Sequence, residues 1–464
     1  MSNVTEEAGV PPVSTAALVR GGVGSTLFNM AFPLLAGTVA MNAYTLTDTW
    51  FVSRLGTQPL AAMAFSFPVI MLLNCVAAGI GNGVMTLVSH SLGRMDHDGA
   101  ARIVTHGSVL MVSVSVIMTL AGYLSIDAVF AGLGADPPTR AMVGDYMRVW
   151  YLGAFSMALP MMGNGILISA GDSRTAGRMM MLGPLINVVL DPIMIFGYVG
   201  FPAMGLRGAA LATVISQVTA TTWMLILLRR KHRLLMFARW PLRAYLDSFR
   251  GILFFGVPNV LSFILMPISA TVITRILGSL GNEAVAAAGA ASRIEMFAFV
   301  IPMALGISLT PFVSQNFGAA RLDRIRTGIR FSVSFAVLYG GGIAVLFFTC
   351  APWIARAFSR DPKVLDVLVA YIRIISFGYG MMEVHRYCGF ILTGLRKPAL
   401  ATTLSAIRVL LILIPLSWLG ARSFGVRGLF LGRLTTDLVS GCIGLATVRF
   451  VFASVRRNAM PSAP

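Results

Sequence analysis

Two aspartates are the residues whose type and position most clearly suggest chemistry, because each lies inside a long apolar run. Asp48 follows Tyr44 by four residues, and Asp191 follows Asn187 by the same spacing. Residues four apart share one face of a helix, so Asn187 and Asp191 present an amide oxygen and a carboxylate to one point. Neither aspartate has a lysine or arginine within a helical turn of sequence. An acid in such a run is costly to bury and is a functional candidate.

Two carboxylates of this kind indicate reversible binding of a cation. In a medium of low dielectric constant they repel each other unless a proton or a cation is bound. A hard cation such as Na⁺ prefers oxygen ligands, and Asp48, Asn187, Asp191 and the Thr213 hydroxyl supply them. The sequence therefore predicts a site for H⁺ or Na⁺ without deciding between them. The alternative is structural: each aspartate caps a kink or pairs with an arginine from another helix.

The acidic residues of the second half differ, because they have basic neighbours. The candidates for a polar network there are Arg293, Glu295, Glu383, His385, Arg386, Arg408, Arg433 and Asp437. Arg433 and Asp437 are four apart, so we expect them to pair within one helix. Two interpretations remain open for this network, a purely structural one and a role in a proton relay or in substrate binding. His90 and His106 lack the spacing of metal ligands, and we expect both to be core or interface histidines.

The elements that must position these residues are membrane-spanning helices. Of the 464 residues, 56% are apolar and 12% charged, with a mean hydropathy of +0.80, whereas an average soluble domain is about 25% charged. A spanning helix needs about 20 apolar residues. Runs of that kind predict twelve helices, at 27–52, 59–90, 103–124, 141–168, 179–200, 206–228, 252–277, 285–315, 331–353, 364–394, 400–420 and 427–450.

The distribution of basic residues predicts the orientation in the membrane. The net charge of +18 would suggest nucleic acid as the partner of a soluble protein, but here cytoplasmic loops explain it. With the N-terminus inside, most lysines and arginines fall in cytoplasmic segments. We therefore expect a multi-pass protein of the cytoplasmic (inner) membrane with both termini in the cytoplasm and no nucleic-acid partner. Residues 1–20 lack a basic region before a short apolar core, so we expect a cytoplasmic tail rather than a cleaved signal.

The hydrophobic map divides into two related halves. The basic stretch from Arg229 to Arg233 follows the sixth run. Arg54-Leu55-Gly56 recurs as Ser279-Leu280-Gly281, and Leu87-Val88-Ser89 recurs at the same offset as Phe312-Val313-Ser314. Six helices are an even number, so the repeats are parallel and enclose a central cleft. The expected divisions are a tail at 1–20, an N-lobe at 21–228, a linker at 229–251, a C-lobe at 252–450 and a tail at 451–464.

Motion and energy supply are also suggested by the sequence. Pro33 removes a hydrogen bond about four turns before Asp48, so a bend there would move the helix around the acid; a static kink is the alternative.

The sequence has no Walker loop, HExxH, GxSxG or dinucleotide fingerprint in a supporting context, and its four cysteines have no metal-site spacing. We therefore expect a protein that is not an enzyme, has no cofactor and uses an ion gradient.

Three motifs resemble those of a known family. They are Asp48-Thr49-Trp50-Phe51-Val52-Ser53-Arg54-Leu55-Gly56, Gly79-Ile80-Gly81-Asn82-Gly83, and Gly205-Leu206-Arg207-Gly208 continuing to Thr213. Together with Asn187 to Pro192 and the echoes in the second half, they resemble the multidrug and toxic compound extrusion (MATE) family over nearly the whole chain.

The resemblance implies a cation-coupled antiporter with twelve helices in two lobes that exports amphipathic, often cationic compounds. In the prokaryotic subgroup that the chain resembles most, the cation site lies in the N-lobe. Carried over by position, Asp48 and Asp191 would be its carboxylates, Asn187 and Thr213 their neighbours, and Tyr44 a hydrogen-bond partner of Asp48. The same comparison implies that Asn42 and Asn164 face the drug cavity and that Pro33 is the bending point.

The sequence departs from another subgroup of the family. That subgroup carries a glutamate in the seventh span, after a Gly-x-Pro motif; here Gly256-Val257-Pro258 is followed by Met266 at that position. The subgroup also carries an acidic residue in the tenth span. When the two sequences are aligned on Gly394, Arg386 occupies that position. Sodium coupling in the C-lobe is therefore not expected.

We expect alternating access, with a monomer in the lipid bilayer that moves small amphipathic molecules. The first alternative is a flippase for lipid-linked oligosaccharides, for which the arginines 293, 386, 408 and 433 would attract pyrophosphate. The second is an intramembrane enzyme, although no nucleophile–base pair stands at helical spacing.

Overall fold

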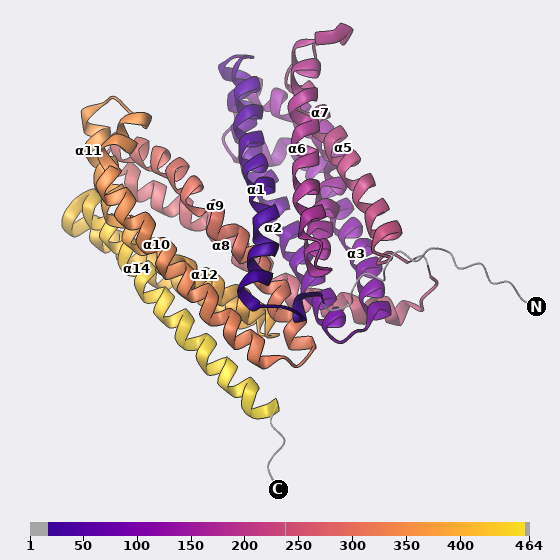
Figure 1. The fold of residues 1–464 in the computed structure, drawn as a ribbon. Coiled ribbons are helices and arrows are strands. Elements are labelled where there is room, and N and C mark those ends of the chain that lie inside the picture. The colour runs from indigo at the N-terminus through magenta and orange to yellow at the C-terminus, as the bar shows by residue number, and fades with distance from the viewer. Residues whose placement is uncertain (1–16, 237, 460–464) are drawn as a thin grey trace, which may run out of the picture.

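The computed structural model describes residues 17–236 and 238–459, and this part of the chain is almost entirely helical (Figure 1). Of the expected tails at 1–20 and 451–464, residues 1–16 and 460–464 lie outside the described residues. The helices of the first half are α1 (Val23–Ser53), α2 (Thr57–Gly93), α3 (His97–Leu124), α4 (Ile126–Gly132), α5 (Pro137–Ser169), α6 (Ser173–Phe196) and α7 (Leu206–Ile226). Those of the second half are α8 (Leu242–Gly278), α9 (Asn282–Gly318), α10 (Leu322–Phe358), α11 (Pro362–Ile375), α12 (Tyr379–Gly394), α13 (Pro398–Ala406) and α14 (Ile414–Ala459).

These helices make twelve passes. Eleven helical stretches within the described residues are long and apolar enough to cross a membrane. The last of them, Pro398–Asn458, contains two passes, because the backbone leaves the helix at Phe424 and Gly425. The chain reverses there, and Gly420 packs on the backbone of Gly428. The all-helical architecture with twelve spanning segments is thus confirmed.

Two predicted domain boundaries, the end of the linker and the end of the C-lobe, fall inside helices and are wrong. Helix α8 begins at Leu242, inside the segment expected to be a linker until 251, and α14 continues to Ala459, past the expected end at 450. Both extensions carry exposed arginines, such as Arg243 and Arg456. Apolar runs in the sequence end where a helix leaves the hydrocarbon region of the membrane. The helix itself continues, because its backbone hydrogen bonds also form in water.

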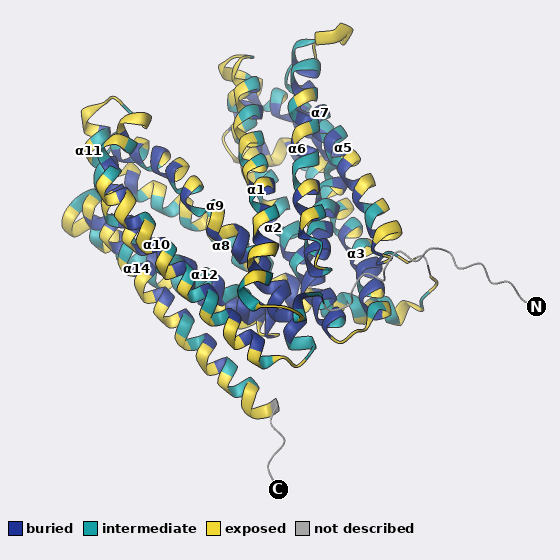
Figure 2. Cartoon of the chain, in the orientation of Figure 1, coloured by how far each residue is buried: buried dark blue, intermediate teal, exposed yellow. Residues whose placement is uncertain are grey.

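Two bundles of helices meet at the end of the molecule where both described termini lie, and they diverge from it (Figure 1). Within the first bundle α1 packs along α6, and α2 along α5; within the second, α12 packs against α10 and α14. Across the junction α2 packs on α8 and α9. The largest hydrophobic cluster includes Val84 and Val88 of α2 together with Ile252 of α8 and Phe312 of α9, and the buried residues in Figure 2 concentrate at this end.

Glycines allow the two bundles to approach closely at the junction. A Cβ atom on Gly93 would overlap the backbone carbonyl of Gln315, and one on Gly318 would overlap that of His90. His90 itself is buried, and its Nε2 lies 3.0 Å from the carbonyl oxygen of Gly394. His90 is therefore an interface histidine, as expected.

The segment before α1 fastens the same junction. Leu18 N donates a hydrogen bond of 2.6 Å to Oε1 of Gln315, whose Nε2 donates to the carbonyl oxygen of Ser169 at 3.1 Å. The guanidinium of Arg324 donates to the carbonyl oxygens of Leu18, Arg20 and Gly21. The end of α9 and the start of α10 thus hold the N-terminal segment and α5 together.

The packing at Gly93 leads to a first prediction. Gly93→Val places a branched side chain against the α9 backbone, which cannot give way as a side chain can, and we expect a loss of about 1–3 kcal/mol in the free energy of unfolding. The melting temperature of the purified protein in detergent measures it. Gly289→Val, in α9 with nothing within 4 Å of the added Cβ, is the matched control. Equal melting temperatures for the two variants would contradict the prediction.

Candidate functional site

Asp48 and Asp191 lie side by side in the first bundle. Each stands five residues before the end of its helix, α1 and α6 respectively, at the end of the bundle away from the junction. Asp48 is 7% exposed and Asp191 is fully buried. Their carboxyl groups are within hydrogen-bonding distance of each other. Two carboxyl groups share a hydrogen bond only when one of them carries a proton, so this arrangement is suited to holding a cation.

Asn187 and Thr213 complete the immediate surroundings. With its amide oriented to satisfy both neighbours, Asn187 Nδ2 donates to Oδ2 of Asp191 at 2.7 Å, and its Oδ1 accepts from the backbone N–H of Thr213 at 3.2 Å. Tyr44 lies beside Thr213, and the carboxyl group of Asp48 lies beside that of Asp191. Tyr44, Asn187 and Thr213 also line a small cavity of about 20 Å³. The spacing of Asn187 and Asp191 thus puts both side chains at one point, as the sequence predicts.

Tyr146 is a member of this cluster that the sequence analysis missed. It belongs to α5, is 5% exposed and lies in the electrostatic field of Asp48, Tyr44 and Asp191. The only signal in the sequence is a phenol next to Asp145 at the start of an apolar run.

No base accompanies the two acids. Within the part of the chain that the structure describes, neither Asp48 nor Asp191 forms an ion pair. The described residues also contain no group of three or more His, Cys, Asp and Glu side chains that would hold a metal ion. Two carboxylates with neutral oxygens form a set of oxygen ligands for a hard cation, and the two carboxyl groups are also able to share a proton.

The remaining predicted residues of the first bundle are spread along it. Asn42 of α1 is half-exposed, and Asn164 of α5 is half-buried with an Oδ1 that has no hydrogen-bond partner. Helix α1 continues without a break across Pro33. A Cβ on Gly177 of α6 would overlap the carbonyl of Pro33, so the two helices touch at this level.

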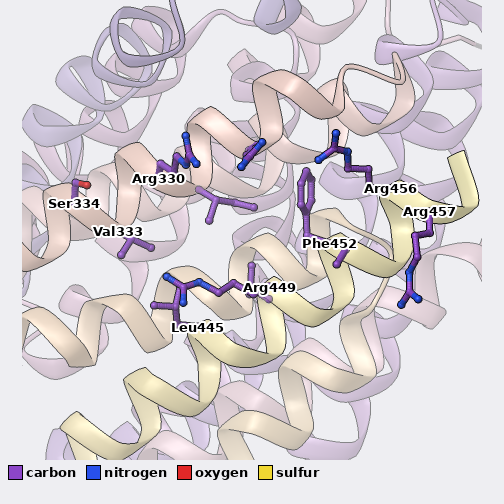
Figure 3. A pocket seen from close by; sticks show the side chains of 12 residues that line it. Arg330, Val333, Ser334, Leu445, Arg449, Phe452, Arg456 and Arg457 are labelled. Atoms are coloured by element: carbon purple, nitrogen blue, oxygen red, sulfur yellow. The ribbon is translucent and has the colours of Figure 1, made fainter. Parts of the chain in front are cut away.

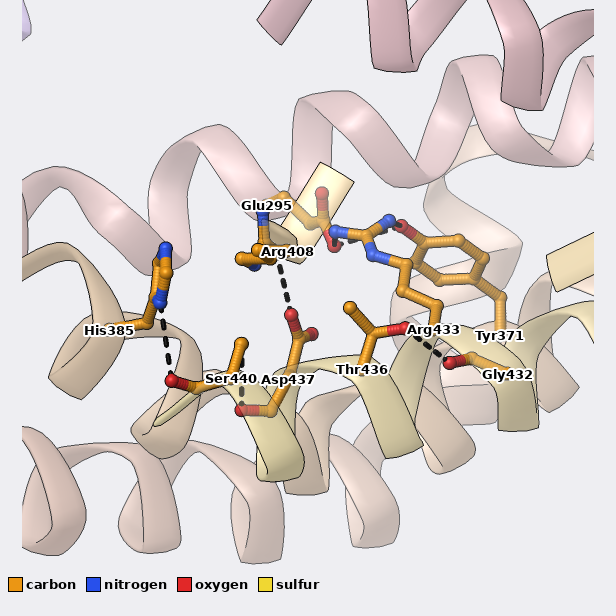
Figure 4. Close-up of polar contacts among 9 residues, drawn as sticks. All are labelled: Glu295, Tyr371, His385, Arg408, Gly432, Arg433, Thr436, Asp437 and Ser440. Atoms are coloured by element: carbon orange, nitrogen blue, oxygen red, sulfur yellow. Dashed lines mark hydrogen bonds and ion pairs between the residues drawn. The ribbon is translucent and has the colours of Figure 1, made fainter. Parts of the chain in front are cut away.

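The second bundle contains the expected polar network, with different partners (Figure 4). Arg433 Nη2 donates to Oε1 of Glu295 at 2.7 Å, and its Nη1 donates to the hydroxyl of Tyr371. Asp437 Oδ1 accepts from Arg408 Nη2 at 2.7 Å. The predicted pair of Arg433 with Asp437 is therefore wrong, because each charge reaches an opposite charge on another helical segment. Only the folded arrangement of α9, α14 and the π-helical turn Ile407–Leu413 brings these partners together.

The four further members of the predicted set lie at different positions. Glu383 is 3.3 Å from Nη1 of Arg386 on the same helix, α12. His385 Nδ1 lies 3.2 Å from the carbonyl oxygen of Ser440. Arg293 is exposed and forms no ion pair with any residue that the structure describes. Every acid of the network thus has a basic partner, whereas Arg293 is available to a ligand.

Removing one partner of the buried pair tests its structural importance. Asp437→Ala leaves Arg408 without its partner at a site where Asp437 is fully buried and Arg408 is 18% exposed, and we expect a loss of about 3–5 kcal/mol. Asp366→Ala breaks an exposed pair, 3.7 Å from Arg427, and should cost about 0–1 kcal/mol. Thermal unfolding in detergent compares the two, and similar losses would exclude the structural interpretation.

Comparison with known proteins agrees with this architecture. A sequence model of the MatE family matches residues 33–193 and 258–419. An FAD transporter of Shewanella oneidensis is 33% identical over 428 residues, which cover 91% of this chain and 94% of the relative. The multidrug export protein MepA of Staphylococcus aureus is 24% identical, covering 90% and 92%.

Solved structures resemble the fold throughout. The Vibrio cholerae MATE transporter VcmN in the bent form superimposes with a TM-score of 0.88 at 26% identity, covering 95% of this chain and 98% of that one. The expectation that the chain is a transporter rather than an enzyme is confirmed. The chain belongs to the MatE family of multi-pass membrane transporters, the multidrug and toxic compound extrusion family that its motifs resemble.

Proposed function

We propose that this transporter is an antiporter in which H⁺ or Na⁺ binding at Asp48 and Asp191 drives export of an amphipathic compound. The observation that carries the proposal is the contact between two buried carboxyl groups with no basic partner among the described residues. Such a pair changes its charge whenever a cation enters or leaves. Tyr44, Asn187, Thr213 and Tyr146 supply the polar atoms around it.

Coupling follows from the position of this pair relative to the junction. We propose that both termini lie in the cytoplasm, as the basic residues favour, with the protein acting as a monomer in the cytoplasmic membrane. The bundles then diverge toward the outside, and the acid pair lies near that side. A cation arriving from outside neutralises the pair, α1 bends near Pro33, and the affinity for the exported compound falls. Linkage makes the effect reciprocal, so the compound also weakens cation binding.

The coupling residues are tested by removing one charge at a time. We expect Asp48→Asn and Asp191→Asn to fold normally and to lose at least about tenfold in gradient-driven export, because a neutral amide cannot exchange its charge for a cation. The measurement is transport by the purified protein in proteoliposomes with an imposed pH or Na⁺ gradient, one at a time. Asp145→Asn, an exposed acid 2.8 Å from Arg207, is the control. Undiminished export by both single variants would exclude the assignment.

Two substrate classes have support. Several relatives are named as multidrug proteins, which favours amphipathic, often cationic compounds. The FAD transporter at 33% identity favours an aromatic dinucleotide, which carries negative charge on its pyrophosphate. Arg293 is exposed and has no acidic partner in the described ranges, and the Arg386 side chain is 30% exposed. The second bundle therefore has positive charge that would attract such an anion.

Transport competition distinguishes these classes. Proteoliposomes loaded with FAD or with an ethidium-like dye are compared under the same gradient, with polyprenyl phosphate as the test of a lipid-linked substrate. If the anion is the substrate, we expect Arg293→Gln to reduce FAD export about tenfold or more, since a charge-assisted contact contributes about 1.5–3 kcal/mol, and to leave dye export unchanged. Equal effects on both compounds would contradict a specific role for Arg293.

A further inference from the structure

A basic groove separates α10 from α14 at the end of the molecule where the described termini lie (Figure 3). Its volume is about 870 Å³. The two helices both pack against α12. Five arginines line the groove, Arg326 and Arg330 from α10 and Arg449, Arg456 and Arg457 from α14.

The spacing of these arginines directs them to common helix faces. Arg326 and Arg330 are four apart, and Arg449 and Arg456 are seven apart, so each pair lies along one side of its helix. All five are exposed, and none forms an ion pair with another residue in the described ranges. Five like charges around one groove repel each other unless an anion is present.

The rest of the groove is apolar. Ile329 and Val333 of α10 face Leu445, Val448 and Phe452 of α14. The apolar surface continues along α10 away from its arginines, where Leu338 is 75% exposed. Because α10 and α14 are membrane-spanning helices, these side chains contact the bilayer, and the arginines at their ends reach the headgroup layer.

We propose that this groove binds an anionic phospholipid, with its phosphate held by Arg330 and Arg449 and its acyl chains along Val333 and Leu445. A phosphate accepts paired hydrogen bonds from planar guanidinium groups, and in an anionic lipid no headgroup cation offsets its attraction to the arginines. Five arginines exceed the charge of one phosphate, so a lipid with two phosphates is favoured over a lipid with one.

This lipid site is separate from the transport machinery. Arg449 follows Asp437 by twelve residues on α14, which is about 18 Å at the rise of an α-helix. The acid pair Asp48–Asp191 belongs to the other bundle. The proposal therefore does not depend on the coupling cation or on the substrate.

Native mass spectrometry of the full chain in detergent tests the proposal. Cardiolipin, phosphatidylglycerol and phosphatidylcholine are added separately at equal concentration, and inorganic phosphate is used as a competitor. We expect adducts to decrease in that order, with cardiolipin the most abundant. Each basic residue near an anionic headgroup contributes about fivefold to its binding, so Arg330→Gln with Arg449→Gln should reduce cardiolipin adducts about 25-fold.

A control variant separates this groove from general surface charge. Arg243→Gln with Arg250→Gln removes the same charge from exposed positions at the start of α8, and it should keep the cardiolipin adducts. A lysine variant, Arg330→Lys with Arg449→Lys, should keep part of them. The melting temperature without lipid verifies that each variant folds.

Three outcomes would overturn the proposal. One is equal binding of phosphatidylcholine and the anionic lipids. Another is an equal loss of cardiolipin in the groove variant and in the α8 control, which would show general attraction to the basic end. The third is complete displacement of cardiolipin by millimolar inorganic phosphate, which would assign the groove to the free anion.

Discussion

The neutralisation of charge inside the membrane is the constraint on which this structure depends. An ionised side chain in the hydrocarbon is costly unless it has a partner. In the second bundle Glu295, Glu383 and Asp437 each have an arginine within 3.3 Å. Among the described residues of the first bundle, Asp48 and Asp191 have only each other and neutral oxygens as partners. The two related halves therefore differ in how their buried acids are neutralised.

This difference determines what each bundle is able to do. A carboxylate paired with a guanidinium keeps its charge, and breaking the pair leaves a buried ion. The second bundle is therefore expected to move as a unit, braced by Arg433 between Glu295 and Tyr371. The acid pair of the first bundle has no fixed counter-charge, so a cation arriving there changes the forces on α1 and α6 directly. For this reason we propose the coupling site in the first bundle.

The sequence predicted the parts of the fold that depend on one helix at a time. The twelve apolar segments and the shared face of Asn187 and Asp191 follow from helical periodicity alone. The partners of Arg433 and Asp437, the membership of Tyr146 and the convergence of the arginines of α10 and α14 depend on how distant helices pack, which spacing does not encode. The early start of α8 was missed because its first turns are polar, and polarity does not end a helix outside the hydrocarbon.

The closed end of the molecule limits how the bundles are able to move. At Gly93 and Gly318 the backbones of α2 and α9 touch without intervening side chains, and the segment at Leu18 is hydrogen-bonded to α9. Packed backbones do not deform gradually, so this junction is either formed or broken. Breaking it requires Arg324 and Gln315 to lose their partners together. A small change in charge at Asp48 and Asp191, near the far end of the first bundle, therefore affects opening only if it shifts the balance between these two states. Pro33 lies on α1 between the acid pair and the junction, so the bend that we propose there would transmit that shift.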